Sequence, residues 1–242
     1  MLKIIYFIFW YITYLIILPI LILFMKIFNK KYDTQLYYYY LNKPFNINHV
    51  WVKKEKKIKG FIFSNHRSWF DFPFDNYHCQ SSPLGRYLGF FAVFFSSILV
   101  YSDNRALMFN RDNVNRKYIY DLCKDRLDNA INNYNHRILV YPEGTRLNYN
   151  ELNSIEDVKN KFKIGLIKEI YQRKEYPIQI FISSNKEKIS NEKKLELGYN
   201  LTVKSAMSSS IHPKNFKTFD DFLNKICQEW LNLWRMTHKN NT

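Results

Sequence analysis

Residues 4–25 contain no charged side chain, and this uninterrupted apolar stretch restricts where the start of the chain can lie. As a helix rising ~1.5 Å per residue it would reach about 33 Å, enough to cross a hydrocarbon core ~30 Å thick. Lys3 precedes the stretch, and three lysines follow it closely. We therefore expect residues 1–31 to form a membrane anchor, although Pro19 leaves open a helical hairpin that dips into one leaflet.

A cleaved signal peptide and a buried helix both account less well for this apolar stretch. A signal peptide has an apolar region of roughly 7–15 residues and a small-residue cleavage site, and neither is found here. A buried helix of a domain that faces water keeps one polar face, and residues 4–25 have hardly a polar break. Because more basic residues follow the stretch than precede it, we expect the rest of the chain on the cytoplasmic face of an internal membrane.

The chain carries a large excess of positive charge. Its 36 Lys and Arg residues outnumber 21 Asp and Glu residues, which gives a formal net charge of +15. This excess favours an anionic membrane surface, a phosphorylated substrate or a nucleic acid, and charge alone does not choose among them. The lysine-rich run 53–59 suits anionic lipid and an ordinary solvated edge equally well.

Composition excludes several classes of protein. A chain with 47% hydrophobic and 18% aromatic residues is not disordered. Its six glycines form none of the patterns that mark a dinucleotide site, a P-loop or a nucleophile elbow. Its three widely separated cysteines form neither a disulfide framework nor a zinc ribbon, and they fit a reducing compartment. We expect no metal site.

Residues 32–242 alternate between short apolar runs and amphipathic stretches, which indicates one α/β domain. The apolar runs at 61–63, 106–109 and 138–141 have the length of buried strands. Strict alternation of apolar and polar residues over 195–203 predicts a half-buried strand.

Three stretches repeat apolar residues at the spacing of an amphipathic helix, and they predict helices over 114–131, 162–171 and 218–234. Asp112 is placed to cap the first helix, and Thr218-x-x-Asp221 has the form of a capping box before the last. The apolar face of the last helix comprises Phe219, Phe222, Ile226, Trp230 and Trp234. The alternation as a whole predicts a mixed, mostly parallel sheet flanked by helices.

The segment Asn65-His66-Arg67-Ser68-Trp69-Phe70-Asp71 follows the first predicted strand. Within one helix, His66 and Asp71 would lie about 140° apart and would not meet. They meet if His66 lies in a turn and Asp71 opens the next helix, a start that Pro73 favours. The carboxylate would then hold one imidazole nitrogen while the other removes a proton from a substrate hydroxyl. Taken alone, the segment is more simply a helix cap, Asp71, beside a loop histidine.

The segment Tyr141-Pro142-Glu143-Gly144-Thr145-Arg146 also follows a predicted strand. Its arginine fork, its hydroxyl and its exposed backbone amides together suit a phosphate group. Taken alone, the segment is slightly more simply a polar turn with a surface ion pair.

Together and in this order, the two segments resemble the motifs of the glycerolipid acyltransferase family, whose type members are the 1-acylglycerol-3-phosphate acyltransferases. That family carries Asn-His-x4-Asp, then an arginine-ended block, then Pro-Glu-Gly-Thr-Arg. The first and third motifs are complete here at 65–71 and 142–146. The resemblance covers roughly residues 58–182.

Other family blocks are only partly matched. Phe109-Asn110-Arg111 resembles the end of the second block, but Arg105 stands where the family has a glycine. Phe162-Lys163-Ile164-Gly165 resembles the stretch that follows the third block. Pro177 matches the fourth block, whose second proline is replaced by Ile180.

The resemblance implies transfer of a fatty acyl group from acyl-CoA to the free hydroxyl of a 1-acylglycerol-3-phosphate (lysophosphatidic acid), which makes phosphatidic acid. His66 would be the general base, and Asp71 would orient its imidazole. Arg146 and Arg111 would hold the acceptor's phosphate. The substrate-binding residues implied are Arg111, Glu143, Gly144, Thr145 and Arg146, with Glu143 steering Arg146. Acyl-CoA is a co-substrate, and no cofactor is expected.

Three alternatives stay open. The same chemistry serves another acceptor, such as glycerol-3-phosphate, another lysophospholipid or lysocardiolipin. The departures at Arg105 and Ile180 allow a catalytically silent membrane-bound scaffold of the same fold. A basic nucleic-acid-binding protein is the least favoured, because no recognition motif is present and the apolar stretch would have no role. We expect lysophospholipid, acyl-CoA and an anionic membrane surface as partners, and no nucleic acid.

Overall fold

The computed structural model describes residues 45–68, 70–86, 106–109, 116–130, 135–147, 152–191 and 194–238, and isolated positions before them. The predicted anchor, residues 1–31, lies outside the described residues apart from those isolated positions, and Arg105 and Arg111 also lie outside them. Within the described residues, no helix combines the length and apolar character needed to cross a bilayer.

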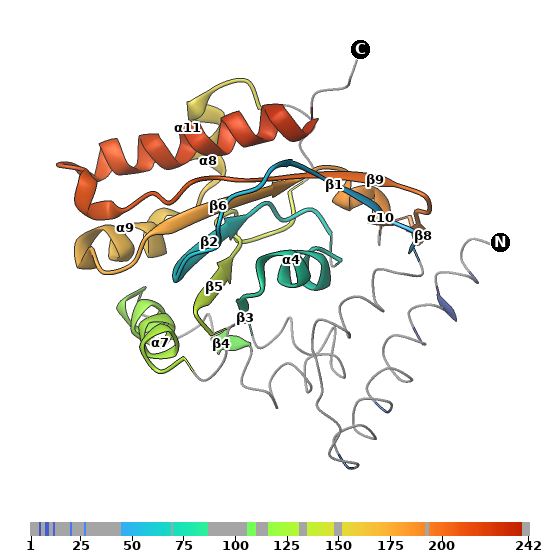
Figure 1. Cartoon of the computed structure of the whole chain (residues 1–242), viewed down its shortest axis with the longest axis horizontal. Coiled ribbons are helices and arrows are strands. Elements are labelled where there is room, and N and C mark those ends of the chain that lie inside the picture. The colour runs from blue at the N-terminus through green and yellow to red at the C-terminus, as the bar shows by residue number, and fades with distance from the viewer. Residues whose placement is uncertain are drawn as a thin grey trace.

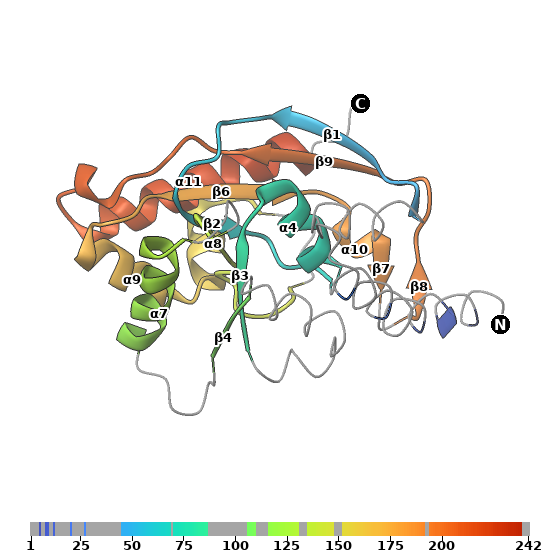
Figure 2. The same cartoon turned by 60° about the horizontal axis from the view of Figure 1, so that its bottom comes forward.

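A seven-stranded sheet forms the centre of the described part of the chain. Its strands are β1 (Asn48–Lys53), β2 (Gly60–Ser64), β3 (Ser82–Arg86), β4 (Leu107–Phe109), β5 (Arg137–Val140), β6 (Ile178–Ser183) and β9 (Thr202–Met207). They are arranged in the order β1-β9-β6-β2-β5-β3-β4, with only the β6–β9 pair antiparallel. Figure 2 shows β1 at one edge and β3 with β4 at the other. The predicted mixed, mostly parallel sheet is confirmed. A small second sheet pairs β7 (Ser190–Asn191) with β8 (Glu196–Leu197).

Helices cover both faces of the sheet, and Figure 1 shows α11 on one side and α4 on the other. The described helices are α4 (Asp71–Cys79), α7 (Arg116–Asp128), α8 (Ile155–Lys161), α9 (Ile164–Arg173), α10 (Lys186–Ile189) and α11 (Phe219–His238), with a 3-10 turn η3 (Pro213–Asn215). Successive strand residues point to opposite faces. Phe61 and Phe63 therefore join the core under α7, α9 and α11, whereas Ile62 joins the core under α4.

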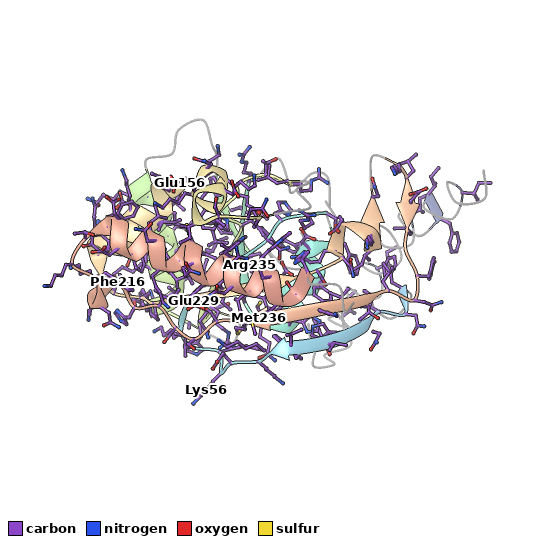
Figure 3. The ribbon with its side chains drawn as sticks, turned by 90° about the horizontal axis from the view of Figure 1, so that it is seen from above. Lys56, Glu156, Phe216, Glu229, Arg235 and Met236 are labelled. Atoms are coloured by element: carbon purple, nitrogen blue, oxygen red, sulfur yellow. The ribbon has the colours of Figure 1, made fainter. Side chains whose placement is uncertain are left out.

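The last helix matches its prediction closely. The hydroxyl of Thr218 accepts a hydrogen bond from the backbone N–H of Asp221 at 3.1 Å, which satisfies a free donor of the first turn. The predicted apolar face is turned to the core, and Trp230 is fully buried, with its ring 4.8 Å from that of Phe162. Figure 3 shows α11 lying along the molecule, with Glu229, Arg235 and Met236 labelled on it.

The predicted strand over 195–203 is wrong. Gly198 packs so closely against the Lys188 carbonyl that a Cβ there would lie 2.2 Å from its oxygen, and Asn200 has a left-handed φ of 54°. These two positions turn the chain, so only Glu196–Leu197 pair before β9 begins at Thr202. Turn geometry overrides the alternating pattern here.

The predicted helix over 162–171 is right in type but starts later. Lys163 has an extended backbone with ψ 93°, so α9 begins at Ile164. A separate helix, α8, precedes it and was not predicted. Ser154 and Asp157 begin α8 with reciprocal hydrogen bonds of 2.9 and 3.1 Å between side chain and backbone. The helix predicted over 114–131 is observed as α7, and Asp112 lies outside the described residues.

The order of the central strands determines where the two motif segments lie. Strands β5, β2 and β6 are parallel neighbours, with Phe63 paired to Val140 and Ser64 paired to Phe181. Their carboxyl ends therefore meet at one edge of the sheet, where α/β folds commonly place their sites. The loops that follow β2, β5 and β6 begin side by side.

Candidate active site

His66 and Asp71 are in direct contact at the carboxyl end of β2. His66 lies in the turn after the strand, and α4 begins at Asp71, as the spacing predicted. The Nδ1 atom of His66 is 2.9 Å from Oδ2 of Asp71. The carboxylate side chain is fully buried, whereas the imidazole is 23% exposed. Asp71 is therefore enclosed by the protein, whereas the imidazole of His66 is partly accessible from outside.

The Asp71 carboxylate is held by several donors besides the imidazole. Its Oδ2 atom accepts hydrogen bonds from the backbone N–H groups of Arg67 and, at 2.9 Å, Ser68. Its Oδ1 atom accepts from the Ser68 hydroxyl at 3.2 Å. Burial by itself raises the pKa of Asp71, but Lys186, the bond from His66 and the Arg67 N–H together hold it below its ordinary value. Asp71 is therefore a rigid anion.

This anion determines the tautomer of His66. An ionised carboxylate only accepts hydrogen bonds, so Nδ1 carries the proton that it donates to Asp71. The other ring nitrogen, Nε2, then has a lone pair and can accept a proton. The ring also stacks on Tyr141, with centroids 4.3 Å apart and planes inclined by 20°. The carboxylate and the stacked ring together fix the direction in which Nε2 points.

Glu143 joins the second motif to the first. Its side chain is buried, and its Oε2 atom accepts a hydrogen bond from the backbone N–H of His66 at 2.7 Å. The backbone carbonyl of His66 accepts a second hydrogen bond, from the N–H of Leu147 at 3.1 Å. The loop after β5 is thus bonded to the main chain of His66 at two points. The sequence did not predict this contact of Glu143, and the expected steering of Arg146 stays a prediction.

The last three residues of the second motif form an exposed turn next to the His66–Asp71 pair. Gly144, Thr145 and Arg146 are exposed. Gly144 has a φ of +69°, a conformation that favours glycine, and a Cβ there would lie 3.0 Å from the side chain of Lys163. An arginine, a lysine and a hydroxyl are therefore carried on or beside one glycine turn, which is a suitable surface for a phosphate. Arg111 lies outside the described residues.

Two charged residues of the site were not predicted. Lys186 follows β6, the third of the neighbouring strands, and is fully buried. Its Nζ atom is 2.8 Å from Oδ2 of Asp75 and 4.0 Å from Oδ1 of Asp71. Asp75 follows Asp71 by one helical turn, so its position on the same face was visible in the spacing. Nothing in the sequence distinguishes Lys186 from the many lysines that lie at the surface.

The described residues contain no group of three or more His, Cys, Asp or Glu side chains arranged to hold a metal ion. Cys79, Cys123 and Cys227 are buried free thiols. Burial raises the pKa of each of them, so none is prepared to act as a thiolate nucleophile. The site itself places an imidazole and a carboxylate beside a basic turn.

Comparison with known proteins identifies the fold. No protein-family model matches the sequence, and no curated protein matches it. Among solved structures, the crystal structure of the 1-acyl-sn-glycerophosphate (LPA) acyltransferase PlsC from Thermotoga maritima is similar, with a TM-score of 0.62. The match covers 96% of this chain and 93% of that one, at 16% sequence identity. The described part of the chain therefore shares its fold with that acyltransferase, in agreement with the resemblance of the motifs.

Proposed function

We propose that the chain transfers a fatty acyl group from acyl-CoA to the free hydroxyl of a 1-acylglycerol-3-phosphate, producing phosphatidic acid. The single observation that carries this proposal is the contact between His66 and Asp71 beside the exposed turn of Gly144–Arg146. The fold shared with an enzyme described as an LPA acyltransferase supports it.

The reaction needs one base and no covalent enzyme intermediate. Nε2 of His66 takes the proton of the acceptor hydroxyl as the oxygen attacks the thioester carbonyl. The carbon–sulfur bond of the tetrahedral intermediate then breaks, and the ester remains on the acceptor. The thiolate of CoA leaves with the electron pair of that bond and then takes the proton from the imidazolium, which regenerates the neutral imidazole. Because a thiol has a pKa near ~8.5, it departs without a strong acid.

Asp71 supports the base and determines its direction. As Nε2 takes a proton the ring becomes a cation, and the buried carboxylate 2.9 Å from Nδ1 stabilises that charge. General-base catalysis of this kind contributes typically ~10²–10⁴-fold. Positioning of acceptor and thioester supplies the rest.

The acceptor's phosphate would bind at the second motif. The guanidinium of Arg146 presents a fork of donors that matches two phosphate oxygens. Gly144 leaves the backbone open to close approach, and Thr145 adds a hydroxyl. We further propose that Arg111 contributes a second guanidinium and that Glu143, besides holding His66, steers Arg146.

The acceptor and the product are both lipids, which gives the predicted anchor and the excess charge a common purpose. An anchor at residues 1–31 would hold the domain at the membrane that supplies the acceptor. The formal charge of +15 and the run of lysines at 53–59 would favour an anionic surface on the cytoplasmic side of an internal membrane.

The proposal is tested with the purified full chain in detergent and one labelled acyl-CoA. The acceptors offered are lysophosphatidic acid, glycerol-3-phosphate, a neutral-headgroup lysophospholipid and lysocardiolipin, and a mock preparation from the same host measures background transfer. We expect labelled phosphatidic acid as the main product. Transfer chiefly to another acceptor would overturn the assignment of substrate, and transfer to none of them would indicate the silent scaffold.

A further inference from the structure

Lys186 connects the catalytic pair to a second buried carboxylate. Its Nζ atom lies 2.8 and 3.0 Å from the two carboxylate oxygens of Asp75, which also accepts from the Ser64 hydroxyl at 2.7 Å. The same Nζ atom is 4.0 Å from Oδ1 of Asp71. One ammonium group therefore serves two buried anions, only one of which contacts His66.

Lys186 also contacts the chain on both sides of His66, at the Asn65 carbonyl and at the Ser68 hydroxyl. Its Nζ atom donates to the carbonyl of Asn65 at 2.6 Å, immediately before His66. Its own carbonyl accepts from the Ser68 hydroxyl at 3.4 Å, and Ser68 in turn donates to Asp71. Lys186 thus bonds the turn that carries the imidazole to α10. The next residue, Glu187, adds an ion pair with Arg67 at 3.4 Å.

The charge balance at this position depends on Lys186. Two carboxylates buried close together repel each other, and burial together with the charge of Asp71 raises the pKa of Asp75 to about 6. The charge of Lys186 opposes that repulsion at both carboxylates. It also acts on His78 and Cys79 of α4 and on His238 of α11. The groups that face His66 itself are Asp71, Tyr141 and Glu143. Lys186 is thus the cation that balances Asp71 and Asp75.

We propose that Lys186 is a positioning residue for acyl transfer, which fixes the negative charge and the orientation of Asp71 and thereby the direction of the His66 base. Nothing else in the proposed mechanism uses Lys186. The kinetic part of this inference rests on the proposed function, because it needs a reaction in which His66 is the base.

The effect of the Lys186 ammonium group is measured by comparing variants that differ only at that residue. Lys186→Met alone would leave the charge of Asp75 buried without its cation. Such a change destabilises the fold whether or not Lys186 has a role in catalysis. The comparison is therefore made between Asp75→Asn and the double variant Asp75→Asn/Lys186→Met, which differ only in the lysine. A second double variant, Asp75→Asn/Lys186→Gln, keeps a donor for the Asn65 carbonyl without the charge. Lys188→Met, an exposed lysine of the same helix, is the matched control.

The readouts are thermal unfolding, kcat, and KM for both substrates, measured on the full chain in detergent. Relative to Asp75→Asn, we expect either double variant to lose about 10- to 100-fold in kcat with little change in KM, because a general loss of structure would weaken substrate binding as well. Folded double variants that keep the kcat of Asp75→Asn would overturn the proposal.

A chemical readout separates this inference from the proposed function. Diethyl pyrocarbonate modifies an unprotonated imidazole nitrogen, and mass spectrometry of the digested chain reports the rate at which His66 is modified at one fixed pH. His66 should be modified more slowly in the double variants than in Asp75→Asn, because the ring no longer keeps Nε2 unprotonated and directed outward, whatever reaction the protein catalyses. An unchanged rate of modification would contradict the role of Lys186, whereas a wild-type chain without acyl transfer would contradict only the proposed function.

Discussion

Asp71 determines which nitrogen of His66 can act as a base, because its carboxylate accepts the Nδ1 proton. In Asp71→Asn, an amide of the same shape can donate to Nδ1 and so favours the tautomer that leaves Nε2 protonated. We expect kcat to fall by ~10²–10⁴-fold while the chain still folds. Steady-state acyl-transfer kinetics with the circular dichroism spectrum measure both. The control is Asp220→Asn at an exposed position of α11, and equal rates for the two variants would contradict the role of Asp71.

Arg146 is exposed on the turn next to the His66–Asp71 pair, and it is proposed to bind the phosphate of the acceptor. Because hydrogen bonds to charged groups contribute about 1.5–3 kcal/mol, Arg146→Ala should raise KM for lysophosphatidic acid by about tenfold or more. KM for acyl-CoA should change less. Arg173→Ala, on α9, is the matched control, since it removes an exposed arginine elsewhere. Equal losses for an acceptor without phosphate would contradict a phosphate-binding role.

At the scale of elements, α11 stabilises the domain by covering one face of the sheet. Trp230 is its largest fully buried side chain, and Met236, on the same helix, is 44% exposed. Trp230→Ala removes buried contacts and leaves a cavity, so we expect a loss of ~3–5 kcal/mol in the free energy of unfolding. Met236→Ala should change it by less than about 0.5 kcal/mol. Urea denaturation measures both, and similar losses would show that α11 contributes little through its buried face.

The packing of β1 on α4 makes stability depend on pH. The rings of His49 and His78 lie 3.8 Å apart between these elements. Burial, with the charge of Lys54, lowers the pKa of His49 to about 4, and burial lowers that of His78 well below its ordinary value. The unfolded chain therefore binds these protons first as pH falls below about 6.5, and the folded state loses stability between pH 6.5 and 4.

For His49 alone, the expected loss between pH 7 and pH 5 is about 2 kcal/mol. Urea denaturation at the two pH values measures it. His49→Gln should reduce this pH dependence, whereas Val50→Ala, at an exposed position of the same strand, should leave it unchanged. The account of the histidine pair fails if the His49 variant loses as much stability on acidification as the wild type.

The parts of the fold that the sequence predicted correctly are those decided by local pattern. The buried runs at 61–63 and 138–141 became β2 and β5, and the apolar face of residues 218–234 became the core face of α11. The prediction for the alternating stretch at 195–203 failed because the turn at Asn200 is held by the carbonyl of Phe45, far away in the sequence, and Gly198 packs against Lys188. Local pattern carries no information about such contacts.

The residues of the site also divide into those that local sequence predicts and those that it does not. His66 and Asp71 were predictable because five residues and one proline determine whether they meet. Lys186 was not, because its burial requires the loops after β2 and β6 to close around α4, which is a property of the assembled sheet. At the scale of the whole molecule, the strand order brings together three loops that are far apart in sequence, and the chemistry depends on that order.

The central claim is that the imidazole of His66 is the base for acyl transfer, and it is tested most directly by the purified full-length His66→Ala variant. The rate of phosphatidic acid formation from labelled acyl-CoA and lysophosphatidic acid is compared with that of the wild type at saturating substrates. We predict a loss of at least ~10²-fold with an unchanged unfolding temperature. A folded variant that acylates lysophosphatidic acid as fast as the wild type would contradict the claim.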